Sequence, residues 1–207
     1  MNWLKEQTGL LGGFLRADFR VVLRLCALTL ALSALVGFAI AYAAPEVVDK
    51  VLEAFMNQIQ EAGVVDETGE LSVFALLMNN WRAMLTSAIW GLIPFLFLPV
   101  LSLFVNGALV GLLGGWVLQR GGSLAFYCAG ILPHGVFEIP ALVLSAACGV
   151  YLCRGLCRII LNRPDKVAAV ELFSELLRVL VLVVAPLTVC AAFIECYITP
   201  VVMAFFM

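Results

Sequence analysis

The chain has 207 residues, of which 64% are hydrophobic and 13% are charged, and its formal net charge is −2. Because soluble domains carry about 25% charged residues, this composition excludes an ordinary soluble protein, and no nucleic-acid partner is expected. We therefore predict an all-α fold, a polytopic membrane helical bundle in which residues 1–207 form one domain surrounded by the lipid bilayer.

The first predicted membrane helix covers residues 25–44. A signal-peptide core has about 7 to 15 apolar residues, whereas about 20 are needed to span a bilayer, so we predict a retained helix. Basic residues precede it, and because basic residues favour the cytoplasm, the N-terminus is predicted to be cytoplasmic. These residues are Lys5, Arg16, Arg20 and Arg24.

An acidic segment, residues 45–82, follows this helix and contains one lysine before Arg82. Its apolar residues recur at helical spacing among polar ones, so we expect an amphipathic helical segment on the external surface. A second short element is expected over residues 71–82 of the same segment, where Trp81 and Arg82 suit the membrane interface.

Residues 83–118 contain no charged residue. This stretch is too long for one span but sufficient for two helices of minimal length, so the chain crosses the membrane either four or five times. Five crossings place a later basic cluster in the cytoplasm, as the positive-inside rule expects, whereas four place it outside. We therefore predict helices over residues 83–99 and 103–118, with a tight turn near Pro99–Ser102.

Two further membrane helices are predicted at residues 124–152 and 176–206, the second with a kink at Pro186. The loop between them carries the basic cluster, which sets the sidedness of the chain. Its members are Arg154, Arg158, Arg163 and Lys166. The prediction is about five transmembrane helices with the C-terminus outside.

A stripe of glycines follows Asn106 at intervals of four residues: Gly107, Gly111 and Gly115. Lipid provides no hydrophobic drive for helix association, so small residues that let two backbones approach are a main source of attachment. The stripe is predicted to face another helix. Spacing alone leaves open whether that helix belongs to the same chain or to a second copy.

The only histidine of the chain, His134, lies one helical turn before Glu138 and between two prolines, Pro133 and Pro140. If the segment is helical, the two ionisable side chains share a face and can pair. Each proline is a predicted helix kink, because it removes one backbone hydrogen bond and leaves a carbonyl in need of a partner. A polar pocket within the membrane is therefore expected here.

Counting residues from the membrane surfaces places Glu195 at a depth similar to that of His134. Asn106, in the preceding predicted helix, is a further polar residue within the membrane. The candidate intramembrane polar site is thus His134, Glu138, Glu195 and Asn106. Buried ionisable groups in membranes are always paired, and this group could be a hydrogen-bonded brace or a proton or ion path. One histidine without a cysteine or second histidine at ligand spacing is a weak metal signal, so no metal and no cofactor is predicted.

Enzyme motifs are absent from the sequence, and no catalytic residue is assigned. Cys153 and Cys157 could be acylation sites or ligands, but plain helix residues are the simpler interpretation.

Four stretches together resemble one family: "NN" at 79–80, Asn106-Gly107 with Gly111, "PHGVFEIPAL" at 133–142 and "IECYITP" at 194–200. In combination they are similar to the stage II sporulation protein M family. The resemblance implies a multi-pass protein of the bacterial cytoplasmic (inner) membrane that anchors envelope or sporulation partners, with cell-wall hydrolases as possible partners. A homodimer or a larger membrane complex is expected. The alternative is a small transporter, channel or permease subunit that uses His134, Glu138 and Glu195 as a proton-sensitive site.

Overall fold

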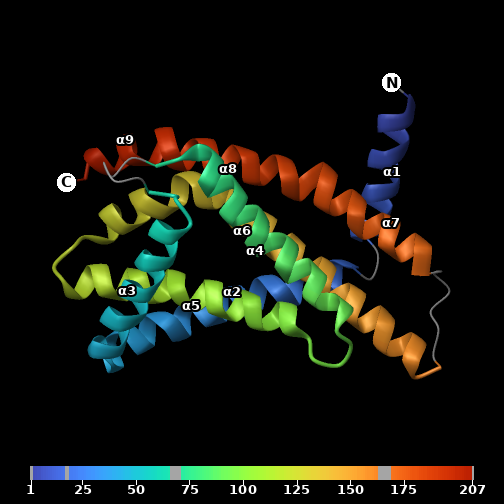
Figure 1. Cartoon of the computed structure of the whole chain (residues 1–207), viewed down its shortest axis with the longest axis horizontal. Coiled ribbons are helices and arrows are strands. Elements are labelled where there is room, and N and C mark those ends of the chain that lie inside the picture. The colour runs from blue at the N-terminus through green and yellow to red at the C-terminus, as the bar shows by residue number, and fades with distance from the viewer. Residues whose placement is uncertain (1, 17–18, 66–70, 163–168, 207) are drawn as a thin grey trace.

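The computed structural model describes residues 2–16, 19–65, 71–162 and 169–206, and the elements within these ranges are all helical (Figure 1). Val65 and Leu71 form an isolated bridge. The helices are α1 (Asn2–Arg16), α2 (Phe19–Ala43), α3 (Pro45–Glu61), α4 (Val73–Ile89), the 3-10 turn η1 (Trp90–Leu92), α5 (Leu98–Gln119), α6 (Leu124–Ile160), α7 (Ala169–Val179), the π-helix η2 (Leu180–Val184), α8 (Ala185–Tyr197) and α9 (Thr199–Ala204). The predicted all-helical fold is confirmed for the described residues.

Four described helical stretches are long and apolar enough to cross a membrane: Phe19–Ala43, Leu98–Gln119, Leu124–Ile160 and Phe173–Tyr197. Large apolar side chains point outward along them. On α2, for example, Leu25, Leu28, Leu32 and Leu35 are between 58% and 67% exposed. Such a surface is unfavourable in water and suits contact with lipid tails.

The predicted span 83–99 differs from the structure at both ends. Helix α4 begins at Val73, inside the segment 45–82 that was predicted to be external, because the Ser72 side chain accepts a hydrogen bond from the Ala75 N–H at 3.3 Å and caps the helix. It has 17 residues and ends at Ile89, before η1. Ile93 is extended, as expected for the residue before a proline.

The turn predicted at Pro99–Ser102 lies between η1 and α5 instead, at residues 93–97. Pro99 is the second residue of α5, where the missing N–H costs nothing. Phe95 and Phe97 adopt left-handed backbone angles in this turn, with φ of 69° and 47°. Two buried thiols of α6 hold it: the Phe95 N–H donates to Cys157 Sγ at 3.1 Å, and Cys153 Sγ donates to the Ile93 carbonyl at 3.5 Å.

Helix α4 with η1 extends along the bundle between two contact points. Near its start, Cys196 Sγ on α8 lies 3.8 Å from the Leu71 carbonyl, to which it donates. Beyond its end, the turn at 93–97 contacts the last part of α6. Helix α6 is longer than the predicted span 124–152 and continues without interruption through Pro133 and Pro140.

The last predicted span, 176–206, is divided in the structure. The π-helix η2 ends directly before Ala185 and Pro186, at the site of the predicted kink, and Ile198 separates α8 from α9. A π-turn is one way to accommodate a proline that cannot donate its backbone hydrogen bond. Of the predicted cytoplasmic basic cluster, Arg163 and Lys166 lie outside the described residues.

The glycine stripe of α5 packs against α2 of the same chain (Figure 1). A Cβ atom added at Gly111 would lie 1.8 Å from the Ala34 carbonyl oxygen, and one at Gly107 would lie 2.0 Å from Ser33 Oγ. At Gly115 the nearest atom would be Ala41 Cβ, at 2.4 Å. The stripe is therefore used within one chain, and it provides no argument for a dimer.

A second close crossing joins α4 and η1 to α6. A Cβ at Gly91 would lie 2.1 Å from the Gly149 carbonyl oxygen, and one at Gly149 would lie 2.5 Å from the Ser87 carbonyl oxygen. The buried Ser145 hydroxyl donates to the Met84 carbonyl at the same interface. Backbone contact and a hydrogen bond together fix α4 on α6.

Two further contacts fix the peripheral helices. On α3, Asp49 accepts hydrogen bonds from the Trp116 indole and from Arg120, both at 2.8 Å, and these partners lower the pKa of the Asp49 carboxyl. At the other end of the bundle, Arg178 on α7 donates to Gln7 on α1 at 2.6 Å. Figure 1 shows α1 and α3 at opposite ends of the molecule, each running across the direction of α2 and α5.

Candidate functional site

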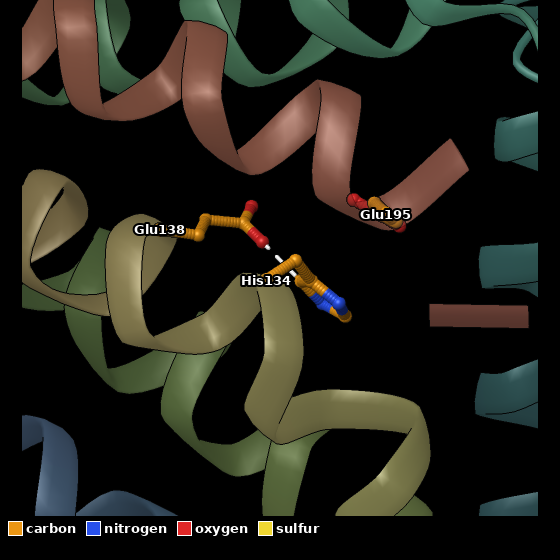
Figure 2. A group of neighbouring side chains, drawn as sticks. All are labelled: His134, Glu138 and Glu195. Carbon is orange, nitrogen blue, oxygen red and sulfur yellow. Dashed lines mark ion pairs between the residues drawn. The ribbon is translucent and has the colours of Figure 1, made fainter. Parts of the chain in front are cut away.

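Three of the four predicted site residues lie together, where α6 meets α8. His134 and Glu138 come from consecutive turns of α6, and Glu195 comes from α8 (Figure 2). One ligand-type atom of each residue, an imidazole nitrogen or a carboxylate oxygen, lies within 4.8 Å of those of the other two. The helical spacing of four residues brings the first pair together, and the antiparallel course of α8 adds the third.

The histidine ring contacts a neighbour on each side. His134 Nε2 lies 3.8 Å from Glu138 Oε2, which is an ion-pair distance but too long for a hydrogen bond. His134 Nδ1 lies 3.3 Å from the hydroxyl oxygen of Thr199, the buried first residue of α9. The His134 and Glu138 side chains are 13% and 30% exposed, so the group is largely but not completely enclosed.

Asn106 does not join this group. Its side-chain amide donates to the Ser102 carbonyl at 2.8 Å, one turn earlier on α5. The hydrogen bond satisfies the polar group within its own helix, as side chains of membrane helices commonly do. Thr199, which was not among the predicted site residues, contacts the His134 ring as the fourth member of the group.

Neither carboxylate forms an ion pair with a lysine or arginine in the part of the chain that the structure describes. Two carboxylates and one imidazole therefore share a small volume of low polarity, where like charges repel strongly. The group can hold its charge only with added protons or a bound cation. Chemically, it can brace helices, carry protons or ligate a metal ion.

Two polar residues of α4 lie elsewhere on this side of the bundle. The Trp81 indole donates to Thr188 Oγ1 on α8 at 2.7 Å. Asn80 is buried, and its side-chain nitrogen has no hydrogen-bond partner among the described residues. Both belong to the stretch predicted as an interfacial element, and both are instead part of the packed helix α4.

A cavity of about 90 Å³ lies between α4, α6 and the α7–η2 stretch, away from the polar group. Its lining is apolar and includes Leu85, Cys148 and Leu176. None of the three ionisable site residues contributes to it. A cavity of this size and lining suits an apolar group and provides no polar route for an ion.

Comparison with known proteins identifies the family of the chain. A family model described as stage II sporulation protein M matches residues 26–200. The chain belongs to the stage II sporulation protein M family. The match includes all four stretches on which the resemblance was based. It runs from Cys26, within α2, to Pro200, the second residue of α9.

Two curated relatives of this stage II sporulation protein M family member are uncharacterized proteins of Methanocaldococcus jannaschii. One is 35% identical over 126 residues, which is 61% of this chain and 70% of the relative. The other is 29% identical over 115 residues, 55% of this chain and 49% of the relative, so the chain spans about half the length of that protein. No solved structure matches the chain significantly.

Proposed function

We propose that this family member is a non-enzymatic membrane scaffold, which crosses the cytoplasmic membrane five times and anchors partner proteins at the outer surface. The observation that supports it best is the attachment of α3 to the end of α5. Asp49 ties this amphipathic helix to Trp116 and Arg120, while Glu46 and Glu53 on the same helix remain exposed. A helix attached in this way, with an exposed acidic face, is a suitable docking element.

Five crossings require α4 to span the membrane. A helix of 17 residues is about 25 Å long, and the hydrocarbon layer is about 30 Å thick, so α4 followed by η1 is just sufficient. The contacts near Leu71 and at Ile93 lie at opposite ends of α4, which agrees with a full crossing. The positive-inside rule then favours a cytoplasmic N-terminus.

Cysteine labelling checks this topology. In a background where the exposed Cys190 is replaced by alanine, we introduce cysteine at Gln58 on α3, at Leu96 in the turn or at Asn162 after α6. A membrane-impermeant maleimide is expected to label Gln58→Cys on intact cells, and to label Leu96→Cys and Asn162→Cys only after permeabilisation. If α4 does not cross, the latter two positions lie outside and are labelled at once.

A transporter, channel or permease subunit is the second candidate, supported by the clustered His134, Glu138 and Glu195. A brace is favoured over a path because His134 on α6 contacts Thr199 on α9, whereas the apolar cavity between α4, α6 and the α7–η2 stretch is not lined by any of the three residues.

The variants His134→Ala and Glu138→Gln separate the two candidates. In a brace, His134→Ala removes the contact with Thr199 on α9, and Glu138→Gln removes the charge that faces His134. Each change is expected to lower the folded yield and the melting temperature, by about 1 to 2 kcal/mol per lost interaction. Wild-type proteoliposomes are expected to show no proton flux with a pH-sensitive dye. Flux that both variants abolish while melting like the wild type would favour the transporter.

The partners remain part of the proposal. A role in sporulation and cell-wall hydrolase partners are suggested only by the family name and the resemblance. Because the two curated relatives come from Methanocaldococcus jannaschii, a general envelope role is favoured over a sporulation role. A homodimer or larger complex is proposed for the scaffold on functional grounds alone. The glycine stripe does not support it, because α2 of the same chain already occupies the stripe.

A further inference from the structure

We propose that His134, Glu138 and Glu195 bind one divalent transition-metal ion of the Zn²⁺ class. This proposal goes beyond the scaffold function and does not depend on it. One imidazole nitrogen and two carboxylate oxygens are ligands that zinc, manganese and ferrous ions accept in proteins. His134 and Glu138 are four residues apart on α6, a spacing that lets two ligands on one helix face reach a common ion.

The separations of the donor atoms are close to those of a metal site. A tetrahedral ion with bonds of about 2.0–2.1 Å keeps its ligand atoms about 3.3–3.4 Å apart. His134 Nε2 and Glu138 Oε2 are 3.8 Å apart, and the whole set lies within 4.8 Å. Figure 2 shows the Glu138 side chain extending toward His134 on α6, with Glu195 on the facing helix α8. Small rotations about the side-chain bonds would bring the donor atoms to the separations of a metal site.

Thr199 supplies the outer contact that metal-binding histidines require. A ligating imidazole usually donates its second ring N–H to an oxygen, which fixes the ring and the tautomer. Thr199 Oγ1 lies 3.3 Å from His134 Nδ1 and can accept that proton. In this tautomer Nε2 carries a lone pair and faces the Glu138 carboxylate. Both groups are then hydrogen-bond acceptors, and their approach is favourable only if a proton or a cation lies between them.

The charge of the group matches a divalent ion. Two ionised carboxylates carry two negative charges, the imidazole is neutral as a ligand, and no lysine or arginine pairs with either carboxylate among the described residues. Isolated charges are expensive in a low-dielectric environment, whereas a neutral metal-ligand set is not. A bound ion would join α6 to α8 directly and to α9 through Thr199, and the fourth position would be left for water.

Metal content of the full-length protein tests the proposal. Protein purified in nanodiscs is stripped with EDTA, incubated with ZnCl₂, freed of excess metal and measured by elemental mass spectrometry. The wild type is expected to retain one zinc ion per chain, and Glu195→Gln less than a tenth of that. Glu53→Gln, on the exposed face of α3, is the matched control and is expected to bind like the wild type.

Thr199→Val separates an outer contact from a ligand. It is expected to keep one ion per chain at saturation but to weaken affinity by about 10 to 100 times, as loss of such contacts does elsewhere. X-ray absorption of the zinc-loaded wild type needs no variant and remains informative if Glu195→Gln does not fold. It is expected to show nitrogen and oxygen neighbours only. Sulfur neighbours, a wild type without retained zinc, or a folded Glu195→Gln variant with full zinc content would each overturn the proposal.

Discussion

Replacement of Gly111 by alanine is expected to destabilise the bundle by more than about 3 kcal/mol and to remove most of the folded protein from membranes. The added Cβ would lie 1.8 Å from the Ala34 carbonyl oxygen and 2.7 Å from the Phe38 nitrogen. Both are backbone atoms of α2, so no side-chain rotation can relieve the overlap, and the two helices must separate. Yield of monodisperse protein and the thermal melting temperature measure the effect.

Gly9 on α1 provides the matched control. An added Cβ there has no atom within 4 Å, and alanine is the better helix former, so Gly9→Ala is expected to melt at or slightly above the wild-type temperature. If Gly111→Ala melts together with Gly9→Ala, the close approach of α2 and α5 is not as the structure has it.

The glycine stripe illustrates how far sequence reasoning extends. Spacing of four residues shows that Gly107, Gly111 and Gly115 share one face, and the physics of lipid shows that this face needs a close neighbour. Spacing carries no information about which helix fills that position. The partner was α2, and its own small residues Ser33, Ala34 and Ala41 became meaningful only once the two helices were side by side.

The start of α4 was predicted ten residues too late, at 83 instead of Val73, because the polar residues before it suggested an interfacial element. Asn79 to Arg82 resemble the end of a surface element, yet Asn80 is buried and Trp81 donates to Thr188 on α8. The turn after α4 was missed for a related reason. Phe95 and Phe97 are not residues that favour a left-handed backbone, and the Cys153 and Cys157 contacts that hold the turn come from a distant part of the chain.

In the candidate site, too, some residues could be predicted from local spacing and others depend on the tertiary structure. His134 and Glu138 could be paired from local spacing alone, and Glu195 followed from a count of residues across the membrane. Thr199 could not be foreseen, because its position depends on the break at Ile198 between α8 and α9. Asn106 was included for its polarity, but its own helix already satisfies it through Ser102.

The second large effect is expected at the opposite end of the bundle, where α1, α2 and α6 meet around three aromatic rings. Phe19 is completely buried, with its ring centroid 4.7 Å from that of Phe14 and 5.6 Å from that of Tyr151. Phe14 and Tyr151 also meet edge to face at 5.4 Å. Each ring therefore supports the other two, and removal of the central one leaves a cavity that helices anchored elsewhere cannot easily fill.

Phe19→Ala is accordingly expected to cost about 3 to 5 kcal/mol, and Phe19→Leu less than half of that because most of the volume is retained. Phe74 on α4 is 73% exposed, so Phe74→Ala makes the same chemical change without a buried cavity and is expected to melt near the wild type. Thermal melting of the three variants in one detergent gives the comparison. An equal loss for Phe19→Ala and Phe74→Ala would mean that exposure to lipid, not packing of the three rings, determines the contribution of phenylalanine here. A selective loss at Phe19 would instead show that packing of the three rings, to which α1 contributes Phe14, determines that contribution.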